Sequence, residues 1–565
     1  MKEYRVCRFF SAFLVVLIAL YTSARMQGQW QIIRHCDAVD LDTLVQKDPR
    51  EIERILRTTY QKLVNNGYLE CRIDTAVVDT LTYYCIQRGH AYTIDSIFIL
   101  HPDHTLEIKP FRKSASIPFS IERMTLAEVN PLKEYNDHGY PFASLQMDTI
   151  QWHEHSANIH WHIEKGPLLR MDSLYIRSDD RVPAPYLRRA LQWHKGHLYN
   201  ENTVRMVDDR IRQTAFLKTA QASAVRFTSS GAQLIIYPQR KPSNTFQGIL
   251  GIRPDDLTGK INLTGDIELR LWNGLNTGEE LYLNWRKLQS QTQDLEARAS
   301  FNYVLGSAFG PDGCIKIYKR DSTFVSIKLN GGISWKPNWR TTLRGFAEKF
   351  TATTLQPSFL FPESSNISAT YYGINYHYTA LDAPNNPRKG VQWKGEVAMG
   401  IRNKVTTNIT DTGTRKERYE ATRLEMELKI FIPTFKKQCI HISNRTSAMQ
   451  TDSIAQNEMY RIGGLRTMRG IDEESILATS FSIMGIEYRY LLDEQTAVYC
   501  FTDICWWEKK SVLRNEKDTP YSFGVGLNLK TNSGIFTFNY ALAKQFDNPI
   551  LVRNAKVSFG FRSVF

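Results

Sequence analysis

The chain has 565 residues, too many for one ordinary domain. Aromatic residues make up 12% of it while the mean hydropathy is only −0.37, which excludes a helical membrane protein but fits transmembrane β-strands, where polar and apolar residues alternate. The net charge of +13 comes from scattered basic residues without a nucleic-acid motif, so we expect an acidic membrane surface as partner and no nucleic acid.

The N-terminus has the pattern of a secretory signal peptide. Basic residues precede an apolar run from Phe9 to Tyr21, and small residues at 22–24 suit a cleavage site. This run is too short to span a bilayer, which needs about 20 residues. We therefore expect residues 1–24 to be removed on export.

The cysteines do not form a disulfide framework. One of the eight lies in the signal peptide, and the odd number that remains is widely spaced. Cys71 and Cys85 flank a predicted hairpin, and the sequence leaves open whether they pair.

The first half of the chain repeats itself. Alternating apolar runs at 94–99 and 171–176 each predict a strand, and helical spacing and two further strands follow each run. This order resembles the POTRA domain, a small periplasmic α/β module, and so long a period indicates domain duplication. We expect α+β POTRA-like domains at 25–89 (abbreviated), 90–166 and 167–241.

A histidine-rich hairpin lies in the second unit. If Ser156 and Ala157 form its turn, His153 faces His160 and four histidines share one face. They are His153, His155, His160 and His162. Such a face is a candidate zinc or copper site. Because the sequence shows no carboxylates placed to orient the imidazoles, we prefer a solvated polar face without metal.

From about residue 245 the chain alternates with a period of two. Eleven strand candidates precede a glycine-rich stretch and five follow it, which gives sixteen, an even number typical of bacterial barrels. Amphipathic strands of an exported chain must close on themselves in lipid, because an open edge leaves backbone groups unsatisfied. We therefore expect an all-β, 16-stranded transmembrane barrel over 242–565.

The stretch 461–471, between the eleventh and twelfth strands, lacks strand alternation and carries Gly463, Gly464 and Gly470. Glycine permits positive φ and close approach of other chain, so this stretch predicts a tightly folded loop. Its Gly-Gly-x-x-x-x-Arg-Gly pattern, with the POTRA-like repeats and sixteen strands, resembles the bacterial surface antigen superfamily. That family includes barrel-assembly, translocation-and-assembly-module and two-partner secretion proteins, and the resemblance covers nearly the whole mature chain.

The resemblance implies a role for the tip of this loop. In the family a Val-Arg-Gly-Phe/Tyr tip folds back into the lumen, and its arginine meets acidic residues on the next two strands. Met468, Arg469, Gly470 and Ile471 stand at the positions of that tip. Because Ile471 replaces the family's aromatic residue, we expect the tip to be packed differently.

The acidic partners follow from the same resemblance. Glu487 and Arg489 match the family's Gly-x-x-Glu-x-Arg stretch on strand twelve, and Phe501 and Asp503 match Phe-x-Asp-x-Gly on strand thirteen. Strand alternation independently turns these residues into the lumen. Cys505 stands where the family has the final glycine, a second departure in the packing.

The family's mechanism implies an outer-membrane factor that captures clients on periplasmic POTRA domains and inserts or translocates them through the barrel. Phe246 and Gly248 on the first strand, with Gly560 and Phe565 on the last, would line a weak seam that opens laterally. Its partners would be unfolded outer-membrane or secreted polypeptides, outer-membrane lipid and possible accessory subunits. The step needs no cofactor.

Two other hypotheses remain. One is a dedicated secretion pore or diffusion channel for one partner, and the sequence does not identify the client. The other is a barrel enzyme such as a lipase, which we disfavour because the chain lacks Gly-x-Ser-x-Gly, His-Glu-x-x-His and a phosphate loop. We therefore expect no enzyme.

Overall fold

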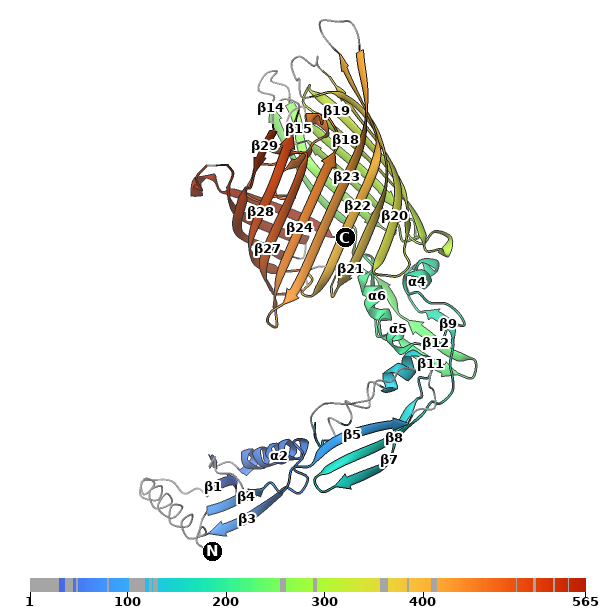
Figure 1. Ribbon diagram of the computed structural model, residues 1–565, viewed down its shortest axis with the longest axis vertical. Helices are drawn as coiled ribbons and strands as arrows, with labels where there is room; N and C mark the ends of the chain where they lie inside the picture. Colours follow the sequence, from blue (N-terminus) through green and yellow to red (C-terminus); the bar gives the residue numbers. More distant parts are fainter. Residues whose placement is uncertain are drawn as a thin grey trace. The chain divides into compact units, whose positions relative to one another are not determined.

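The chain divides into two compact units, shown in the computed structural model of Figure 1. The first comprises residues 1–170 with 197–203, and the second 171–196 with 204–565. None of the described helices is both long and apolar enough to cross a membrane. The predicted signal peptide lies outside the described residues, which are 30–35, 44–46, 49–78, 81–100, 117–120, 124, 131–254, 261–287, 292–355, 364–383, 386–407, 414–493, 495–511, 515–531, 534–546 and 548–564.

The first unit contains two four-stranded sheets with the same topology. In each, the opening strand pairs in parallel with the closing strand, and the closing strand pairs antiparallel with the strand before it. Their orders are β2-β1-β4-β3 and β6-β5-β8-β7. The strands are β1 (Trp30–His35), β2 (Leu44–Gln46), β3 (Arg72–Val78), β4 (Leu81–Gln87), β5 (Thr93–Leu100), β6 (Ile117–Pro118), β7 (Ser144–His153) and β8 (Ser156–Glu164).

Helix α2 (Pro49–Asn65) packs in the core beside the first sheet. It opens on proline, whose missing N–H is no loss in the first turn. Ile52 and Leu63, on its apolar face, are buried with Ile86 of β4. The chain leaves the helix through Gly67, whose φ of +91° suits glycine and where a Cβ would lie 2.3 Å from the Tyr92 oxygen.

Cys71 and Cys85, whose pairing the sequence left open, do not pair with each other. Cys71 carries a free thiol buried in the core against α2, and burial raises its pKa. Cys85 is disulfide-bonded, and its position on β4 is opposite Asp74.

The histidine hairpin turns two residues earlier than predicted. Glu154 adopts a φ of +52° in the turn, so Ser156 already pairs with His153. The same register sets His160 opposite Thr149, so the predicted pairing of His153 with His160 is wrong. Among the described residues, no group of three His, Cys, Asp or Glu side chains is placed to hold a metal ion.

The second unit opens with a third α/β module in which the same pairing recurs. Strand β9 (Met171–Ile176) lies parallel to β12 (Gly231–Ile236), which is antiparallel to β11 (Ala224–Thr228). Leu187 and Ile211 are fully buried on two of its helices. Its other elements are α4 (Ala184–Ala190), α6 (Val207–Gln213), β10 (Leu217–Thr219) and β13 (Pro238–Arg240), and α5 (Glu201–Arg205) spans the boundary between the two units.

The barrel that follows is closed, antiparallel and 16-stranded, which confirms the predicted fold class. Short β29 and longer β30 both pair with β28 and are separated by Thr519 and Pro520, so they form one interrupted strand. The strands are β14 (Thr245–Pro254), β15 (Ile261–Trp272), β16 (Glu280–Lys287), β17 (Gln293–Ser300), β18 (Phe309–Arg320), β19 (Phe324–Trp335), β20 (Thr341–Thr354), β21 (Asn366–Leu381), β22 (Gly390–Thr407), β23 (Thr414–Pro433), β24 (Gln438–Gln450), β27 (Ser480–Leu491), β28 (Ala497–Lys510), β29 (Asn515–Asp518), β30 (Tyr521–Thr531), β31 (Gly534–Lys544) and β32 (Lys556–Val564).

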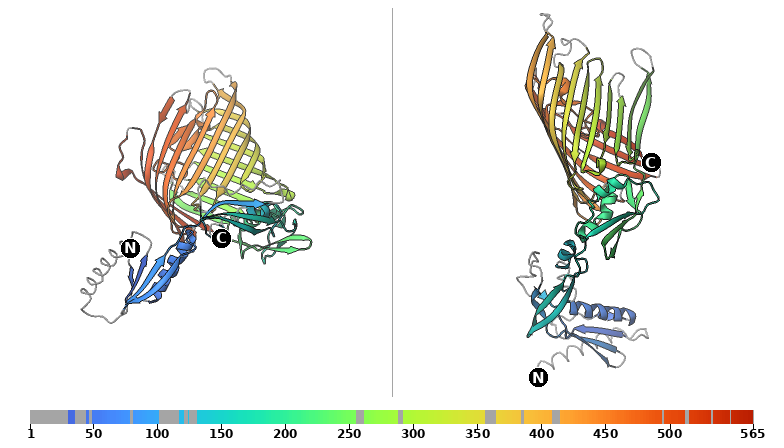
Figure 2. Two further views of the ribbon diagram at one scale, coloured as in Figure 1. Left: turned by 60° about the horizontal axis from the view of Figure 1, so that its bottom comes forward. Right: turned by 90° about the vertical axis from the view of Figure 1, so that its right-hand side faces the viewer.

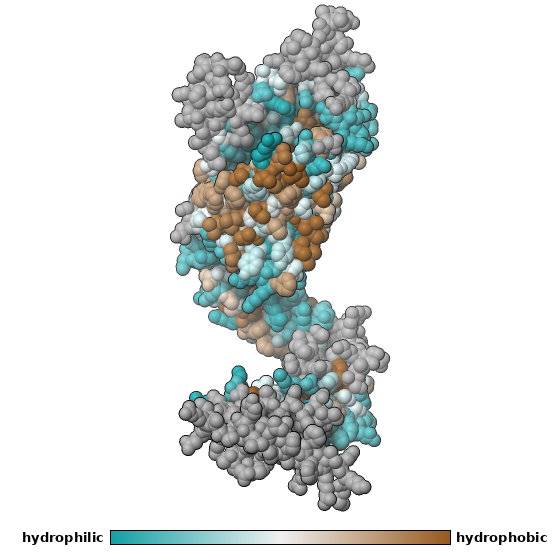
Figure 3. All heavy atoms as spheres, turned by 90° about the vertical axis from the view of Figure 1, so that its left-hand side faces the viewer, coloured by the Kyte–Doolittle hydropathy of each residue, from teal (hydrophilic) through white to brown (hydrophobic). Residues whose placement is uncertain are grey.

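Alternation gives the barrel an apolar outside and a polar inside. On β27 Met484 and Ile486 are exposed, whereas Glu487 is 6% exposed. Figure 3 shows apolar residues gathered midway along one face of the barrel, between more polar ends. The strands slant across the wall in each view of Figure 2, as in other membrane barrels.

The third module is seated on the turns at one end of the barrel, called here the module end; the opposite end is the far end. Gln192 donates a hydrogen bond to the Pro337 carbonyl (3.0 Å), and Arg189 donates to that of Gly306. The ring of Tyr186 on α4 covers Gly278, where an added Cβ would lie 2.2 Å from the ring. Backbone with a φ of +80° and this close approach both require glycine at 278.

Candidate functional site

The stretch between β24 and β27 folds into the lumen as a tight loop. Strands β25 (Tyr460–Ile462) and β26 (Ile476–Ala478) pair at its base. Gly463 has a φ of +120°, and a Cβ there would lie 2.0 Å from the backbone carbonyl oxygen of Asp472. The Gly464 N–H donates to the Ile471 carbonyl at 3.0 Å, which closes the tip on itself.

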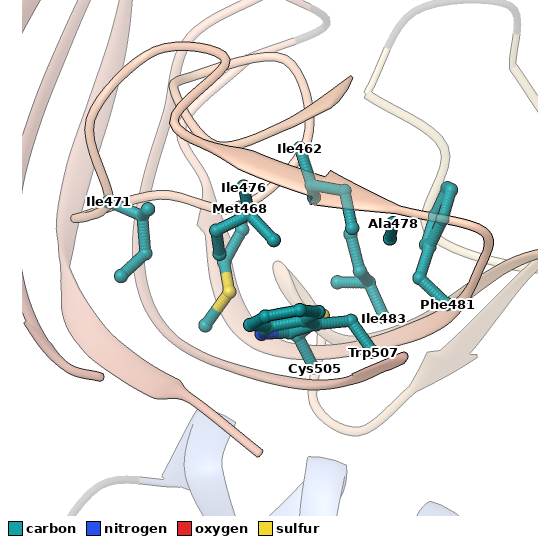
Figure 4. Close-up of a cluster of buried hydrophobic side chains, with 9 residues drawn as sticks. All are labelled: Ile462, Met468, Ile471, Ile476, Ala478, Phe481, Ile483, Cys505 and Trp507. Carbon is teal, nitrogen blue, oxygen red and sulfur yellow. The ribbon is translucent and has the colours of Figure 1, made fainter. Parts of the chain in front are cut away.

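The tip rests on a buried apolar cluster (Figure 4). Met468 is fully buried and Ile471 is 7% exposed. Cys505 is also fully buried and belongs to the same cluster. Ile471 and Cys505, the two departures from the family pattern, therefore pack in one cluster. Its members are Ile462, Met468, Ile471, Ile476, Ala478, Phe481, Ile483, Cys505 and Trp507.

Arg469 is held by carboxylates from two neighbouring strands. Its Nε and one terminal nitrogen donate to the two Asp503 oxygens at 2.8 and 2.6 Å, and its other terminal nitrogen donates to Glu487 Oε1 at 2.7 Å. The guanidinium carbon lies 3.6 Å from the centre of the Phe501 ring. The guanidinium thus forms a bidentate ion pair with Asp503 and stacks on the Phe501 ring, an arrangement that suits the planar arginine side chain. We call these contacts of Arg469 the grip.

Glu487 is shared. Its other oxygen accepts a hydrogen bond from Arg489 Nε at 2.6 Å and lies 3.1 Å from His441 Nδ1. Two guanidinium groups therefore face two carboxylates in a site whose acidic side chains are under 10% exposed. Such a cluster tolerates desolvation only while every charge has its partner.

A second ion pair, which the sequence did not reveal, fixes the start of the loop. Arg402 of β22 donates to both Glu458 oxygens, at 2.8 and 2.5 Å, and to the carbonyls of Asp452 and Ser453. The two side chains are 0% and 3% exposed. The inward position of Arg402 on its strand was the available signal, but nothing in the sequence identified a loop residue as its partner.

The loop also reaches strands on both sides of the junction between the first and last strands. Arg466 lies 3.4 Å from Asp266 on β15, and Glu473 accepts from Arg286 on β16 at 3.0 Å. On the other side, Asp472 lies 2.6 Å from Lys556 on β32. We call these contacts the loop bridge.

The junction itself is sparse. Among the described residues, β14 and β32 share two residue pairs, Thr245 with Val564 and Phe246 with Ser563. The Phe246 ring lies over Gly248. A Cβ added at Gly560 would lie 3.7 Å from Thr537 Cβ on β31. Phe565 lies outside the described residues. The other strand pairs of the barrel are longer, so this junction is the weakest seam in the wall.

The barrel sequence identifies the family. Residues 288–562 match the Omp85 superfamily domain. The barrel therefore belongs to the Omp85 superfamily. The match confirms the superfamily predicted for the barrel.

Three solved structures are similar to the chain at low sequence identity. BamA from Haemophilus ducreyi lacking POTRA domains 1–3 is 14% identical, with 84% of this chain and 100% of that chain covered and a TM-score of 0.45. CdiB from Acinetobacter baumannii is 12% identical, with 91% and 97% covered and a TM-score of 0.49. CdiB from Escherichia coli is 13% identical, with the same coverage and a TM-score of 0.48. No curated protein matches the chain.

The match of the barrel to the Omp85 superfamily domain supports an outer-membrane location and a role in protein assembly or secretion. Members of this family are transporters and assembly factors. The family match accordingly supports polypeptides as the kind of partner.

Proposed function

We propose that this Omp85 protein captures unfolded polypeptides on its N-terminal modules, in the periplasm, and inserts them into the outer membrane through the seam between β14 and β32. The observation that carries the proposal is the seam itself, held by two residue pairs where each neighbouring junction has seven or more. A junction so short opens at less cost than any other in the barrel, because fewer backbone hydrogen bonds must break.

The luminal loop supports the same reading. Arg469 fixes the loop to β27 and β28, while the loop bridge reaches both sides of the seam. The loop thus stiffens the wall from within at the place where direct pairing is weakest. We propose that this grip holds the barrel in its active conformation.

The modules provide surfaces for clients. In the second sheet β7 is an edge strand, and eight of its ten side chains are exposed. An extended polypeptide can add to such an edge by backbone hydrogen bonding, with little sequence preference.

Depletion of the protein followed by proteomics of the outer membrane tests the proposal. We expect a general loss of barrel proteins. Loss of one secreted protein would instead indicate a dedicated secretion pore, and an unchanged outer membrane would contradict both. Cross-linking from β7 then checks whether the lost proteins are direct clients.

A further inference from the structure

The outer face of the barrel carries an apolar furrow across β15 to β18. Its cavity volume is about 520 Å³. Small residues form its floor and larger aliphatic residues its walls, whose Leu283 and Ile315 are 40% and 36% exposed. The floor is Ala297, Ala299 and Gly313, and the walls include Leu269, Leu283 and Ile315.

The furrow is not a requirement of the backbone. A Cβ at Gly313 would have the Asn330 oxygen at 4.0 Å as its nearest neighbour, and Gly313 has no positive φ. A side chain at this position would fit the strand and fill the open space. Glycine therefore leaves room on the lipid-facing surface rather than inside the wall.

Two lysines lie beyond the far end of the furrow. Lys287 on β16 and Lys319 on β18 face outward on either side of Gln293, which pairs with Lys319. Neither lysine forms an ion pair with any described residue. Asp321, in the turn beyond Lys319, accepts a hydrogen bond from Thr292 at 2.8 Å. The outer face of the barrel therefore carries two positive charges four residues beyond Leu283 and Ile315, and neither has a counter-ion among the described residues.

The dimensions fit one leaflet of a membrane. Six residues separate Lys319 from Gly313, which is about 20 Å along a strand at about 3.3 Å per residue. With strands tilted about 45°, the depth is about 14 Å, close to half of the roughly 30 Å hydrocarbon thickness. A lipid with its headgroup at the lysines would lay an acyl chain past Trp285 and Ile317 and reach the furrow near the middle of the bilayer.

We propose that this furrow is a binding site for a membrane lipid of net negative charge, with its phosphate at Lys287 and Lys319 and an acyl chain over Gly313. Charge complementarity selects an anionic headgroup, because Lys side chains at a membrane edge attract acidic lipids. The aliphatic walls and open floor supply the contact for the chain.

Native mass spectrometry of the delipidated full-length protein tests this, with dimyristoyl phosphatidylglycerol and dimyristoyl phosphatidylcholine as probes. We expect at least fivefold higher occupancy by the anionic lipid. Gly313→Leu should lower that occupancy at least fivefold, whereas Gly345→Leu, with no atom within 4 Å of its Cβ and two strands away from the furrow, should leave it unchanged.

The charges are tested separately, which keeps the proposal falsifiable if Gly313→Leu does not fold. Lys287→Gln with Lys319→Gln should remove the preference for phosphatidylglycerol, and Lys416→Gln on β23 should not. Equal binding of the two lipids, displacement by inorganic phosphate alone, or a wild-type dimer that Gly313→Leu converts to a monomer would each overturn the proposal. The last result would assign the furrow to a second copy of the chain.

Discussion

Arg469 carries a charge that depends on buried partners. Its side chain is 15% exposed, and its two partners are 4% and 7% exposed. Arg469→Ala or Asp503→Ala leaves a buried charge without its partner, which typically costs about 3–5 kcal/mol. We expect each variant to insert in the outer membrane but to complement a depleted strain poorly.

Two controls distinguish this grip from loop charge in general. Arg469→Lys keeps the charge but loses the planar fork, so we expect an intermediate phenotype. Arg466→Ala removes a loop arginine that is 48% exposed, and its cost should be below about 1 kcal/mol. Full complementation by Arg469→Ala and Asp503→Ala would contradict the role of the grip.

Arg402 and Glu458 form a fully buried pair, which predicts a non-additive result. Arg402→Met or Glu458→Met alone should lower the free energy of unfolding by about 3–5 kcal/mol, while the double variant should recover most of this loss. Urea unfolding of the refolded barrel in vesicles measures all three. Additive losses would show that the two side chains do not act as a pair.

Glu279, in a module-end turn, predicts a pH dependence. Burial disfavours its ionised form, but the N–H groups of Leu275 and Thr277 and the Thr277 hydroxyl donate to its carboxylate and lower its pKa below the ordinary 4.5. A lowered folded-state pKa stabilises the fold above pH 4.5, and this stabilisation is lost as the pH falls through the folded-state value. Glu279→Gln should therefore have a lower melting temperature than wild type at pH 6, and the difference should shrink towards pH 3. A constant difference would exclude the carboxylate as its cause.

The seating of the third module on the barrel is a property of whole elements. Gly278→Ala places a Cβ against the Tyr186 ring and strains a φ of +80°, so we expect thermolysin to release the modules faster. Gly196→Ala carries similar strain at a φ of +84° with no atom within 4 Å of the Cβ, and it should cost only about 1 kcal/mol. Equal cleavage of the two variants would show that backbone strain alone, and not disruption of the contact with α4, causes the faster release.

Elements were predictable where one periodicity governs a long segment. Glu487 and Asp503 were assigned to the lumen by the family resemblance and independently by alternation, because each strand has one side in lipid and the other in the barrel. The histidine hairpin was misassigned since its turn depends on Glu154 adopting a positive φ, which periodicity does not encode. The pairing of Arg402 with Glu458 was missed because they are 56 residues apart and one is in a loop.

At the scale of the molecule, an even number of strands puts Thr245 and Val564 at the same end of the barrel. If the modules lie in the periplasm, Arg553→Cys in the far-end turn before β32 should react with a membrane-impermeant maleimide on intact cells. Asn338→Cys, in a module-end turn, should react only after the outer membrane is permeabilised. Wild-type protein reports the background of native thiols, and the reverse pattern would contradict the placement.

The number of strands followed from counting the alternating segments. Their closure followed because an open edge in lipid leaves backbone groups unsatisfied. The interruption between β29 and β30 could not be predicted from the sequence, because Pro520 breaks the strand without changing the alternation on either side. The loop bridge also could not be predicted, because it joins Arg466 and Asp472 to strands at opposite ends of the barrel sequence.

The short seam has a consequence for hydration. β14 has ten residues and β32 has nine, yet two pairs join them among the described residues. Backbone groups that face the seam beyond those pairs need water as a partner, because hydrocarbon offers none. Their amide protons should therefore exchange with solvent much faster than those between β14 and β15, so that the seam forms a narrow wet line through an otherwise dry wall.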